Sequence, residues 1–331
     1  MPTHRLDVLA IGNAIVDVIA DASDEFVTAQ NVPKGSMRLV DEAEAERLYR
    51  AMGPARELSG GSAANTVAGL AALGLKAGFI GQLADDQLGQ IFTHDIRSLG
   101  VEFDTPPRDD VGATARCLIL VTPDAQRTMN TFLGAAQMLE RRAVDPARIA
   151  EARTLYLEGY LWDPDAARAA MLAAIDAAHV AGTKVAFTLS DSFVVNRHRQ
   201  DLLKLLDQGR IDILFANEVE ILQLADAAEL DAAVAAIAHM VATLVVTRSE
   251  QGALAVSGGE RAVVAAEPIE RLVDTTGAGD LFAAGFLAGE ARGLGLERSL
   301  KLGAIAAAEV IQHYGARPEC DLKALAGHLL P

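Results

Sequence analysis

The 331-residue chain has only two cysteines, Cys117 and Cys320. Two thiols cannot build a disulfide framework or a zinc site, and they are typical of proteins in a reducing compartment. Positive charge is also scarce, because 29 lysines and arginines face 45 aspartates and glutamates and the formal net charge is −16. Since no basic stripe is present, we expect neither nucleic acid nor an anionic membrane as a partner. A nucleotide is still compatible with this charge, because Mg2+ and backbone N–H groups can bind phosphates on an acidic protein.

Several sequence signatures are missing as well. The most apolar N-terminal run, residues 8–20, is broken by Asn13 and Asp17 and has no basic region or cleavage site. We therefore expect neither a signal peptide nor a membrane span, and a cytoplasmic protein. No G-x-x-x-x-G-K-[ST], H-E-x-x-H or G-x-S-x-G sequence occurs, which excludes a P-loop and disfavours a catalytic zinc. The glycine spacing from Gly60 to Gly69 also argues against a Rossmann dehydrogenase.

Short apolar runs alternate with longer helical stretches along most of the chain. Several short runs are apolar without a break, which is typical of parallel strands covered on both faces. The expected strands lie at residues 8–11, 77–80, 118–121, 154–157, 185–188, 213–215 and 243–247, and the expected helices at 63–73, 166–179, 201–206, 229–241, 281–290 and 299–313. This order predicts an α/β protein with a doubly wound, mostly parallel sheet.

Two segments interrupt the alternation. Residues from about 13 to 40 and from 101 to 131 are irregular, and the second segment is rich in Asp, Pro, Thr and Gly with hairpin-like signals. We expect these segments to pair as a small β lid on the main domain. No internal repeat, low-complexity tract or linker is visible, so residues 1–331 are expected to form a single domain.

Residues 273–282 are the most informative segment of the chain. Gly277 and Gly279 flank Ala278, Asp280 follows at once, and a strongly helical run begins there. Such a turn points unpaired N–H groups and the positive end of the helix dipole outward, so it can receive an anion. A carboxylate beside a bound phosphate is a poor binder but a useful base for a hydroxyl, as in a phosphoryl-transfer site. An ordinary acidic helix start after a glycine turn explains this segment equally well.

Two further patterns fit a substrate site. Gly60 and Gly61 lead into an alanine-rich helical run, where Ser62 is placed to cap the helix and Asn65 can contact hydroxyl groups. Asp17 follows the first expected strand, and α/β sheets bind ligands at the C-terminal ends of their parallel strands. One carboxylate can accept two hydrogen bonds from a vicinal diol, which suits a sugar. Taken singly, each pattern is better explained as a plain helix start or a solvent-facing turn.

Two other strand ends carry polar residues. Asn217 and Glu220 follow the strand at 213–215 and could form a water-mediated magnesium site near phosphates. Solvated acids at a helix start are an equal alternative there. The strand at 243–247 ends in Thr247 and runs through a turn to Gly252, which could face the phosphates of a nucleotide.

Together these motifs resemble the ribokinase (PfkB) family of carbohydrate and nucleoside kinases over nearly the whole chain. The glycine pair with Asn65 matches the N-terminal signature, residues 274–280 match the C-terminal one, and residues 217–220 match the magnesium motif between them. The resemblance implies the family's three-layer α/β/α fold with a small β lid, and ATP and Mg2+ as cofactors. It also implies that Asp280 is the base on the acceptor hydroxyl and that Gly277, Ala278 and Gly279 form the anion hole.

Within the family the chain is most similar to adenosine kinases. Three stretches carry this likeness, residues 12–17, 189–193 and 212–218. A lid-side segment with Arg127 is also similar, and in adenosine kinases an arginine there approaches the transferred phosphate. The chain departs from the pattern at Ser249, where the family usually has a glycine in its T-x-G turn. Residues 34–38 also lack the pair of side chains that adenosine kinases use near the base.

The resemblance therefore implies an ATP-dependent kinase that acts on the 5′-hydroxyl of a nucleoside, with adenosine converted to AMP in purine salvage. A sugar kinase acting on ribose or a fructose derivative is the alternative enzyme, and a non-catalytic nucleoside-binding regulator is the alternative of another class. The implied site residues are Asn13, Asp17, Gly60, Gly61, Ser62, Asn65 and Trp162 for the substrate, Asn217, Thr247, Gly252, Thr276, Gly279 and His313 for the nucleotide, and Asn217 and Glu220 for the metal.

Trp162 follows the strand at 154–157, where it and Tyr160 could form an aromatic wall that stacks on a purine. Packing of both rings under the neighbouring helix is the alternative. The family often has a monovalent-cation site near Asp274 and Gly315, which makes K+ a further candidate cofactor. We expect a monomer or a homodimer.

Overall fold

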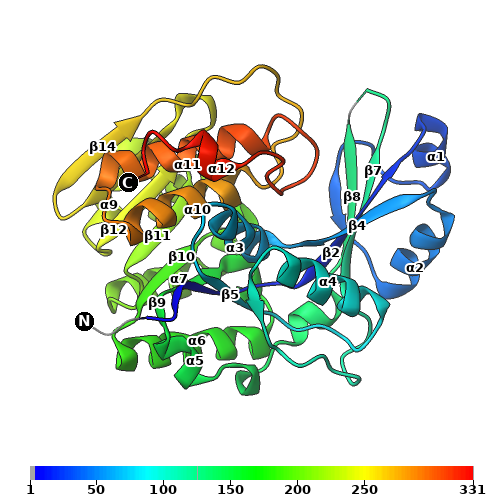
Figure 1. The fold of residues 1–331 in the computed structure, drawn as a ribbon, viewed down its shortest axis with the longest axis horizontal. Coiled ribbons are helices and arrows are strands. Elements are labelled where there is room, and N and C mark those ends of the chain that lie inside the picture. The colour runs from blue at the N-terminus through cyan, green and yellow to red at the C-terminus, as the bar shows by residue number, and fades with distance from the viewer. Residues whose placement is uncertain (1–3, 125, 331) are drawn as a thin grey trace.

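The computed structural model describes residues 4–124 and 126–330. Its main body is built on a nine-stranded sheet with the order β14-β13-β12-β11-β10-β9-β1-β5-β6 (Figure 1). The strands of this sheet are β1 Leu6–Ile11, β5 Ala77–Ile80, β6 Glu102–Phe103, β9 Ala152–Glu158, β10 Lys184–Thr188, β11 Ile213–Asn217, β12 Thr243–Thr247, β13 Ala253–Ser257 and β14 Glu260–Val264. The strands from β12 to β6 pair in parallel, whereas β13 and β14 are antiparallel. The expected mostly parallel sheet is confirmed.

A second, five-stranded sheet stands beside the main body, with the order β3-β8-β7-β2-β4 (Figure 1). Its strands are β2 Ile15–Asp21, β3 Met37–Leu39, β4 Ala55–Gly60, β7 Ala115–Val121 and β8 Arg127–Phe132. β2 is the link between the two sheets, because it follows β1 of the large sheet after a turn of only a few residues. β4 lies outside the two segments in which we expected the small lid.

Helices cover the large sheet on both faces. They are α3 Ser62–Ala72, α4 Gln87–Ser98, α5 Pro146–Ala150, α6 Asp165–Ala181, α7 Ser192–Asp207, α8 Glu218–Ala225, α9 Leu230–Ala238, α10 Ala278–Ala291, α11 Leu296–Val310 and α12 Leu322–Leu325. Two further helices, α1 Asp24–Ala29 and α2 Glu42–Ala51, lie beside the small sheet (Figure 1). α7 begins at Ser192 rather than at residue 201, because the Asp191 side chain caps it by accepting from the Phe193 N–H at 2.6 Å. Within the described residues, no helix has both the length and the apolar character needed to cross a bilayer.

Alternate residues of the central strands enter two separate hydrophobic cores. Val8 and Ala10 of β1 pack in one core with α3, α10 and α11, whereas Leu9 and Ile11 pack in the other with α6 to α9. Figure 1 shows these helix layers on opposite sides of the sheet. Burial on both faces explains why these strands are apolar without a break. The predicted three-layer α/β/α fold is confirmed.

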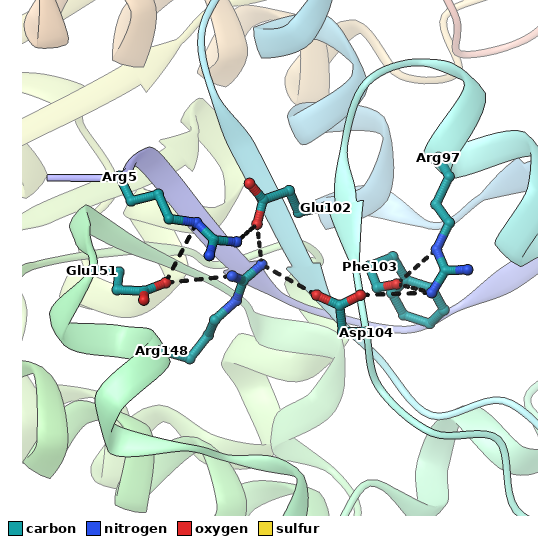
Figure 2. A network of polar contacts seen from close by, with 7 residues as sticks. All are labelled: Arg5, Arg97, Glu102, Phe103, Asp104, Arg148 and Glu151. Carbon is teal, nitrogen blue, oxygen red and sulfur yellow. Dashed lines mark hydrogen bonds and ion pairs between the residues drawn. The ribbon is translucent and has the colours of Figure 1, made fainter.

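An ion-pair network lies at the N-terminal ends of the parallel strands (Figure 2). Arg148 of α5 donates to Glu102 of β6 at 2.6 Å and also pairs with Glu151, just before β9. Arg5, just before β1, pairs with the same two acids. The network is largely exposed, so each pair contributes little stability. This network occupies the edge of the sheet at the N-terminal ends of the strands. We therefore expect a ligand site at the opposite edge, at the C-terminal ends of the strands.

Candidate active site

Asp280 lies in the first turn of α10 and is bonded to the first turns of α3. Ser62 Oγ donates to its Oδ1 at 2.6 Å, and Asn65 Nδ2 donates to its Oδ2 at 2.9 Å. Burial raises the pKa of Asp280, while these two bonds and the charge of Arg317 oppose the rise. The structure thus joins the two glycine-containing motifs at one carboxylate.

The glycine pair lies where β4 meets α3. A Cβ on Gly60 would lie 2.4 Å from Oδ2 of Asp17, and a Cβ on Gly61 would lie 2.2 Å from the carbonyl oxygen of Asn13. Gly61 also has a φ of 96°, in the left-handed region that favours glycine. Gly61 is the N-cap residue of α3 and no side chain caps this helix, so the expectation that Ser62 caps it is wrong. The Ser62 hydroxyl reaches Asp280 instead.

Asp17 projects from β2 of the small sheet and shares an electrostatic environment with Asp280. Burial raises the pKa of Asp17 to about 6, and the charges of Arg317 and Arg127 oppose that rise while Asp280 adds to it. The two carboxylates therefore belong to one site, although one comes from the small sheet and the other from the main body.

Two amide oxygens in this region accept no hydrogen bond from the described residues. They are Oδ1 of Asn13 and Oδ1 of Asn65, and both are buried. The nitrogens of the same amides are engaged, with Asn13 Nδ2 donating to Glu158 at 2.6 Å and Asn65 Nδ2 donating to Asp280 at 2.9 Å. A buried acceptor without a donor costs free energy. Each oxygen is thus suited to accept a hydrogen bond from a hydroxyl group of a ligand.

Glu158 at the end of β9 is a site residue that the sequence analysis missed. It is fully buried, and its carboxylate accepts from the backbone N–H groups of Asn13 and Ala63, each at 2.7 Å. Burial raises the pKa of Glu158 to about 7, although these bonds oppose the rise. Glu158 therefore ties the turn after β1 to the start of α3. An acid directly after the apolar run at 154–157 was the signal that could have revealed it.

The turn before α10 has the geometry of an anion site. Gly277 has a φ of 80° and is the N-cap residue of α10, which begins at Ala278. A Cβ on Gly277 would lie 2.5 Å from Cβ of Ala316, so close packing requires a glycine there. A Cβ on Gly279 would meet no described atom within 4 Å, which leaves space over the first turn of the helix. Free N–H groups at an open helix N-terminus fit phosphate oxygens.

Arg127 connects the small sheet to the segment before this turn. Its guanidinium forms a buried ion pair with Asp274 and donates to Oγ1 of Thr276 at 3.2 Å. Asp274 also accepts from the N–H of Gly315 at 3.2 Å and from the N–H of Thr276 at 3.0 Å. Arg127 and Thr276 thus lie beside the anion turn, and their contacts with ATP stay predictions. The K+ site near Asp274 and Gly315 stays a prediction.

Asn217 and Glu220 form a capping box at the start of α8. Asn217 Oδ1 accepts from the Glu220 N–H at 2.8 Å, and both Glu220 carboxylate oxygens accept from Asn217, at 2.9 and 2.7 Å. Burial raises the pKa of Glu220 to about 7. Asn217 donates to both Glu220 oxygens, and this arrangement fits a Mg2+ ion held through bound water. Among the described residues, no cluster of three or more His, Cys, Asp or Glu could hold a metal ion.

The remaining nucleotide-side residues lie in turns. Thr247 ends β12, and Gly252 has a φ of 83° with a carbonyl oxygen 2.0 Å from where a Cβ would stand. Ser249 has a φ of 51°, so it keeps the left-handed backbone that a glycine favours at this position. His313, after α11, places Nε2 3.2 Å from Oε1 of Glu309. Nucleotide contacts of Thr247, Gly252 and His313 stay predictions.

The expectation that Trp162 forms an aromatic wall is wrong. Only 1% of the residue is exposed, and its ring packs edge-on against Phe187 with centroids 5.7 Å apart. It lies in the core beneath α6 and offers no face to a ligand. Tyr160 is 39% exposed and does not join Trp162 in the core.

The fold and site define a class of enzyme, and comparison with known proteins agrees. Residues 6–323 match the pfkB family carbohydrate kinase model, so the chain belongs to this family. It is a kinase that acts on a sugar or a nucleoside.

Three relatives illustrate its place in the family. The structure of adenosine kinase from Sinorhizobium meliloti is 48% identical, with a TM-score of 0.89 over 98% of this chain and 99% of that one. A probable sugar kinase from Rhizobium etli CFN 42 is also 48% identical, with a TM-score of 0.90 over 98% of each chain. Adenosine kinase from Saccharomyces cerevisiae is 27% identical over 93% of this chain and 95% of its own. The chain is equally similar to the adenosine kinase and to the probable sugar kinase, so these comparisons do not distinguish a nucleoside from a sugar as the phosphoryl acceptor.

Proposed function

We propose that this kinase transfers the terminal phosphoryl group of ATP to the 5′-hydroxyl of adenosine and releases AMP and ADP. The observation that carries the proposal is the position of Asp280, held by Ser62 and Asn65 at the open N-terminus of α10. A base beside an anion site has a use in phosphoryl transfer and none in simple binding. This argues against a non-catalytic regulator, as does membership of a kinase family.

In the proposed reaction, Asp280 accepts the proton of the acceptor hydroxyl as its oxygen bonds to the terminal phosphorus. The bond from that phosphorus to the bridging oxygen breaks, and ADP leaves. N–H groups of the Gly277–Gly279 turn stabilise the charge on the transferred group, with Arg127 in reach from the small sheet. Mg2+, when bound with ATP, would neutralise phosphate charge, with Asn217 and Glu220 holding it through water.

The sugar of the acceptor is proposed to lie between the small sheet and α3. Asp17 accepts from two neighbouring hydroxyls, and the unpartnered oxygens of Asn13 and Asn65 accept further ones. Gly60 and Gly61 let the Asp17 carboxylate and the Asn13 carbonyl approach the backbone closely, which keeps these sugar-side groups together. The small sheet carries Asp17 and Arg127 together, so its closure would orient the sugar and exclude water.

Assignment of adenosine rests on the likeness to the Sinorhizobium meliloti enzyme. A substrate panel with Mg2+–ATP tests it, in which kcat/KM is measured for adenosine, other nucleosides, ribose and fructose. Adenosine should have the highest value. A sugar with a higher kcat/KM than any nucleoside would replace this assignment with the second candidate, a sugar kinase.

Two observations favour that second candidate enough to keep it in the panel. The Rhizobium etli relative is equally similar to this chain. In addition, burial of Trp162 removes the aromatic surface that a purine would stack on. The polar contacts described above hold a furanose sugar whether or not it carries a base, so only the panel separates the two acceptors.

A further inference from the structure

Arg317 lies in the segment after α11 and reaches across to the substrate side of the site. Its Nε and Nη2 donate to the carbonyl oxygen of Ser59 at 3.1 and 2.5 Å, and Nη2 also donates to Ser59 Oγ at 2.9 Å. Its Nη1 donates to the carbonyl oxygen of Ala64 at 2.7 Å. One side chain thus holds the end of β4 and the first turn of α3, the two elements that flank Gly60 and Gly61.

The position of Ser59 is fixed from a second side as well. Asp95 of α4 accepts from the Ser59 N–H at 2.8 Å and from its hydroxyl at 2.5 Å. The residues next to Arg317 contact the opposite part of the site, because Ala316 packs on Gly277 and the Gly315 N–H donates to Asp274. Residues 315–317 therefore connect the anion turn with the glycine pair.

The charge of Arg317 also acts on the acids of the site. Arg317 opposes the burial that raises the pKa of both Asp280 and Asp17. Burial lowers the pKa of Arg317 itself to about 10, so it is still a cation near neutral pH.

Other charged groups surround Asp280 too. Asp17 and Glu158 are the acids that couple to it, and the Arg127 cation is held in an ion pair with Asp274. In residues 4–124 and 126–330, Arg317 forms no ion pair, and its partners are carbonyl and hydroxyl oxygens. Asp95, Asp17 and Asp280 are the acids whose charges act on Arg317, so its charge is shared among these carboxylates.

We propose that Arg317 is a positioning residue for phosphoryl transfer. It holds the end of β4 and the first turn of α3, from which Asn65 donates to Asp280, and its cation on this side of the site favours the ionised form of that carboxyl. This inference rests on the proposed role of Asp280 as the base.

The pH dependence of kcat at saturating adenosine, or at saturating concentration of the panel sugar that replaces it, tests the inference in the full-length protein, because titration of Asp17 acts on the acceptor KM. Arg317→Gln should move the acid limb upward by about half a unit to one unit, because loss of a nearby cation favours the protonated carboxyl. Its activity relative to the unchanged protein should therefore fall more at pH 6 than at pH 8. Arg317→Lys should keep the acid limb but raise KM for the acceptor, because an ammonium group cannot bridge the Ser59 and Ala64 carbonyls as a planar guanidinium does.

Arg292→Gln is the matched control. Arg292 also donates only to carbonyl oxygens, those of Ala288 and Leu73, but it lies at the far end of α10, about 18 Å along the helix from Asp280. It should leave the acid limb in place. If the acid limb of Arg317→Gln is unshifted while Asp280→Asn is inactive, the role of Arg317 is wrong but the proposed function still stands. If Asp280→Asn is active, the proposed base is wrong instead. Where Arg317→Gln does not fold, Arg317→Lys carries the test, and an unchanged acceptor KM overturns the positioning role.

Discussion

The Ser62 hydroxyl donates a 2.6 Å hydrogen bond to Oδ1 of Asp280, across 218 positions of sequence. The bond joins the first turn of α3 to the first turn of α10, so both helices begin at one point of the molecule. N–H groups without intrahelical partners meet there, next to a carboxylate. This contact explains why two short glycine motifs far apart in the sequence form a single site.

The first prediction concerns Asp280. Asp280→Asn should keep the fold and the affinity for both substrates, because the Asn oxygen can still accept from Ser62 or Asn65. It should lower kcat by roughly 10²–10⁴, the usual contribution of a general base. Steady-state kinetics with calorimetry of acceptor binding measures both quantities. Near-normal turnover would remove Asp280 from the mechanism.

The second prediction concerns Asp17, whose pKa is raised to about 6. The ionised carboxylate accepts two hydroxyl hydrogen bonds and the protonated form does not, so KM for the acceptor should rise as pH falls through about 6. KM for ATP should stay nearly constant, since Asp17 belongs to the sugar side. Asp17→Asn should raise the acceptor KM at pH 8 and flatten its pH dependence. An equal loss of affinity for both ligands would indicate a folding or lid effect.

The third prediction separates backbone strain from site geometry. Gly61 and Gly182 have φ of 96° and 72°, but a Cβ on Gly182 would meet no atom within 4 Å, whereas one on Gly61 would lie 2.2 Å from Asn13 O. Gly182→Ala should cost about 1–2 kcal/mol of folding stability and leave kinetics unchanged. Gly61→Ala should cost more and also raise the acceptor KM, because Asn13 must move. Denaturant unfolding and kinetics on both variants decide this, and equal effects would contradict it.

The sequence predicted the parallel strands well because their signal is direct. A strand buried on both faces must be apolar throughout, and β1, β5, β9, β10, β11 and β12 all contain the runs expected for them. The antiparallel strands β13 and β14 were not predicted. Of these two, only β14 is an edge strand, and its exposed residues break up the apolar run that marks the buried strands. The two glycine turns, before α3 and before α10, were also predicted. In each turn a Cβ would collide with a neighbouring atom, so glycine is required there and marks the turn in the sequence.

Residues whose role depends on what packs around them were not predictable. The sequence pattern of an acid at a strand end does not tell whether the acid faces solvent or is buried. Glu158 is buried, and it accepts hydrogen bonds from backbone N–H groups. An aromatic ring at a strand end likewise faces a ligand or the core, and Trp162 faces the core. The Arg317 contacts join residues 258 and 253 positions apart, which no local pattern reveals.

The fourth prediction follows from the burial of Trp162 against Phe187. Trp162→Ala should destabilise the fold by about 3–5 kcal/mol, the usual cost of removing a large buried ring. At temperatures where the variant is folded, the ratio of its affinities for adenosine and ribose should be unchanged. Trp162 is the only tryptophan, so tryptophan fluorescence reports on this side chain alone. Adenosine should not quench it. Strong quenching with a selective loss of adenosine affinity would restore the aromatic wall.

The last prediction concerns Ser249, which has a φ of 51° and stands where the resemblance places the family's usual glycine. A side chain in this left-handed region costs about 1–2 kcal/mol, and the extra freedom of glycine in the unfolded chain offsets about half of that gain. Ser249→Gly should therefore stabilise the fold by about 0.5–1 kcal/mol, measured by denaturant unfolding. Ser98→Gly is the control, because Ser98 is helical at the end of α4, where glycine should destabilise instead. The turn already has the backbone that glycine favours, so KM for ATP should not change in Ser249→Gly. A several-fold drop in that KM without a gain in stability would show that the Ser249 side chain itself obstructs the nucleotide.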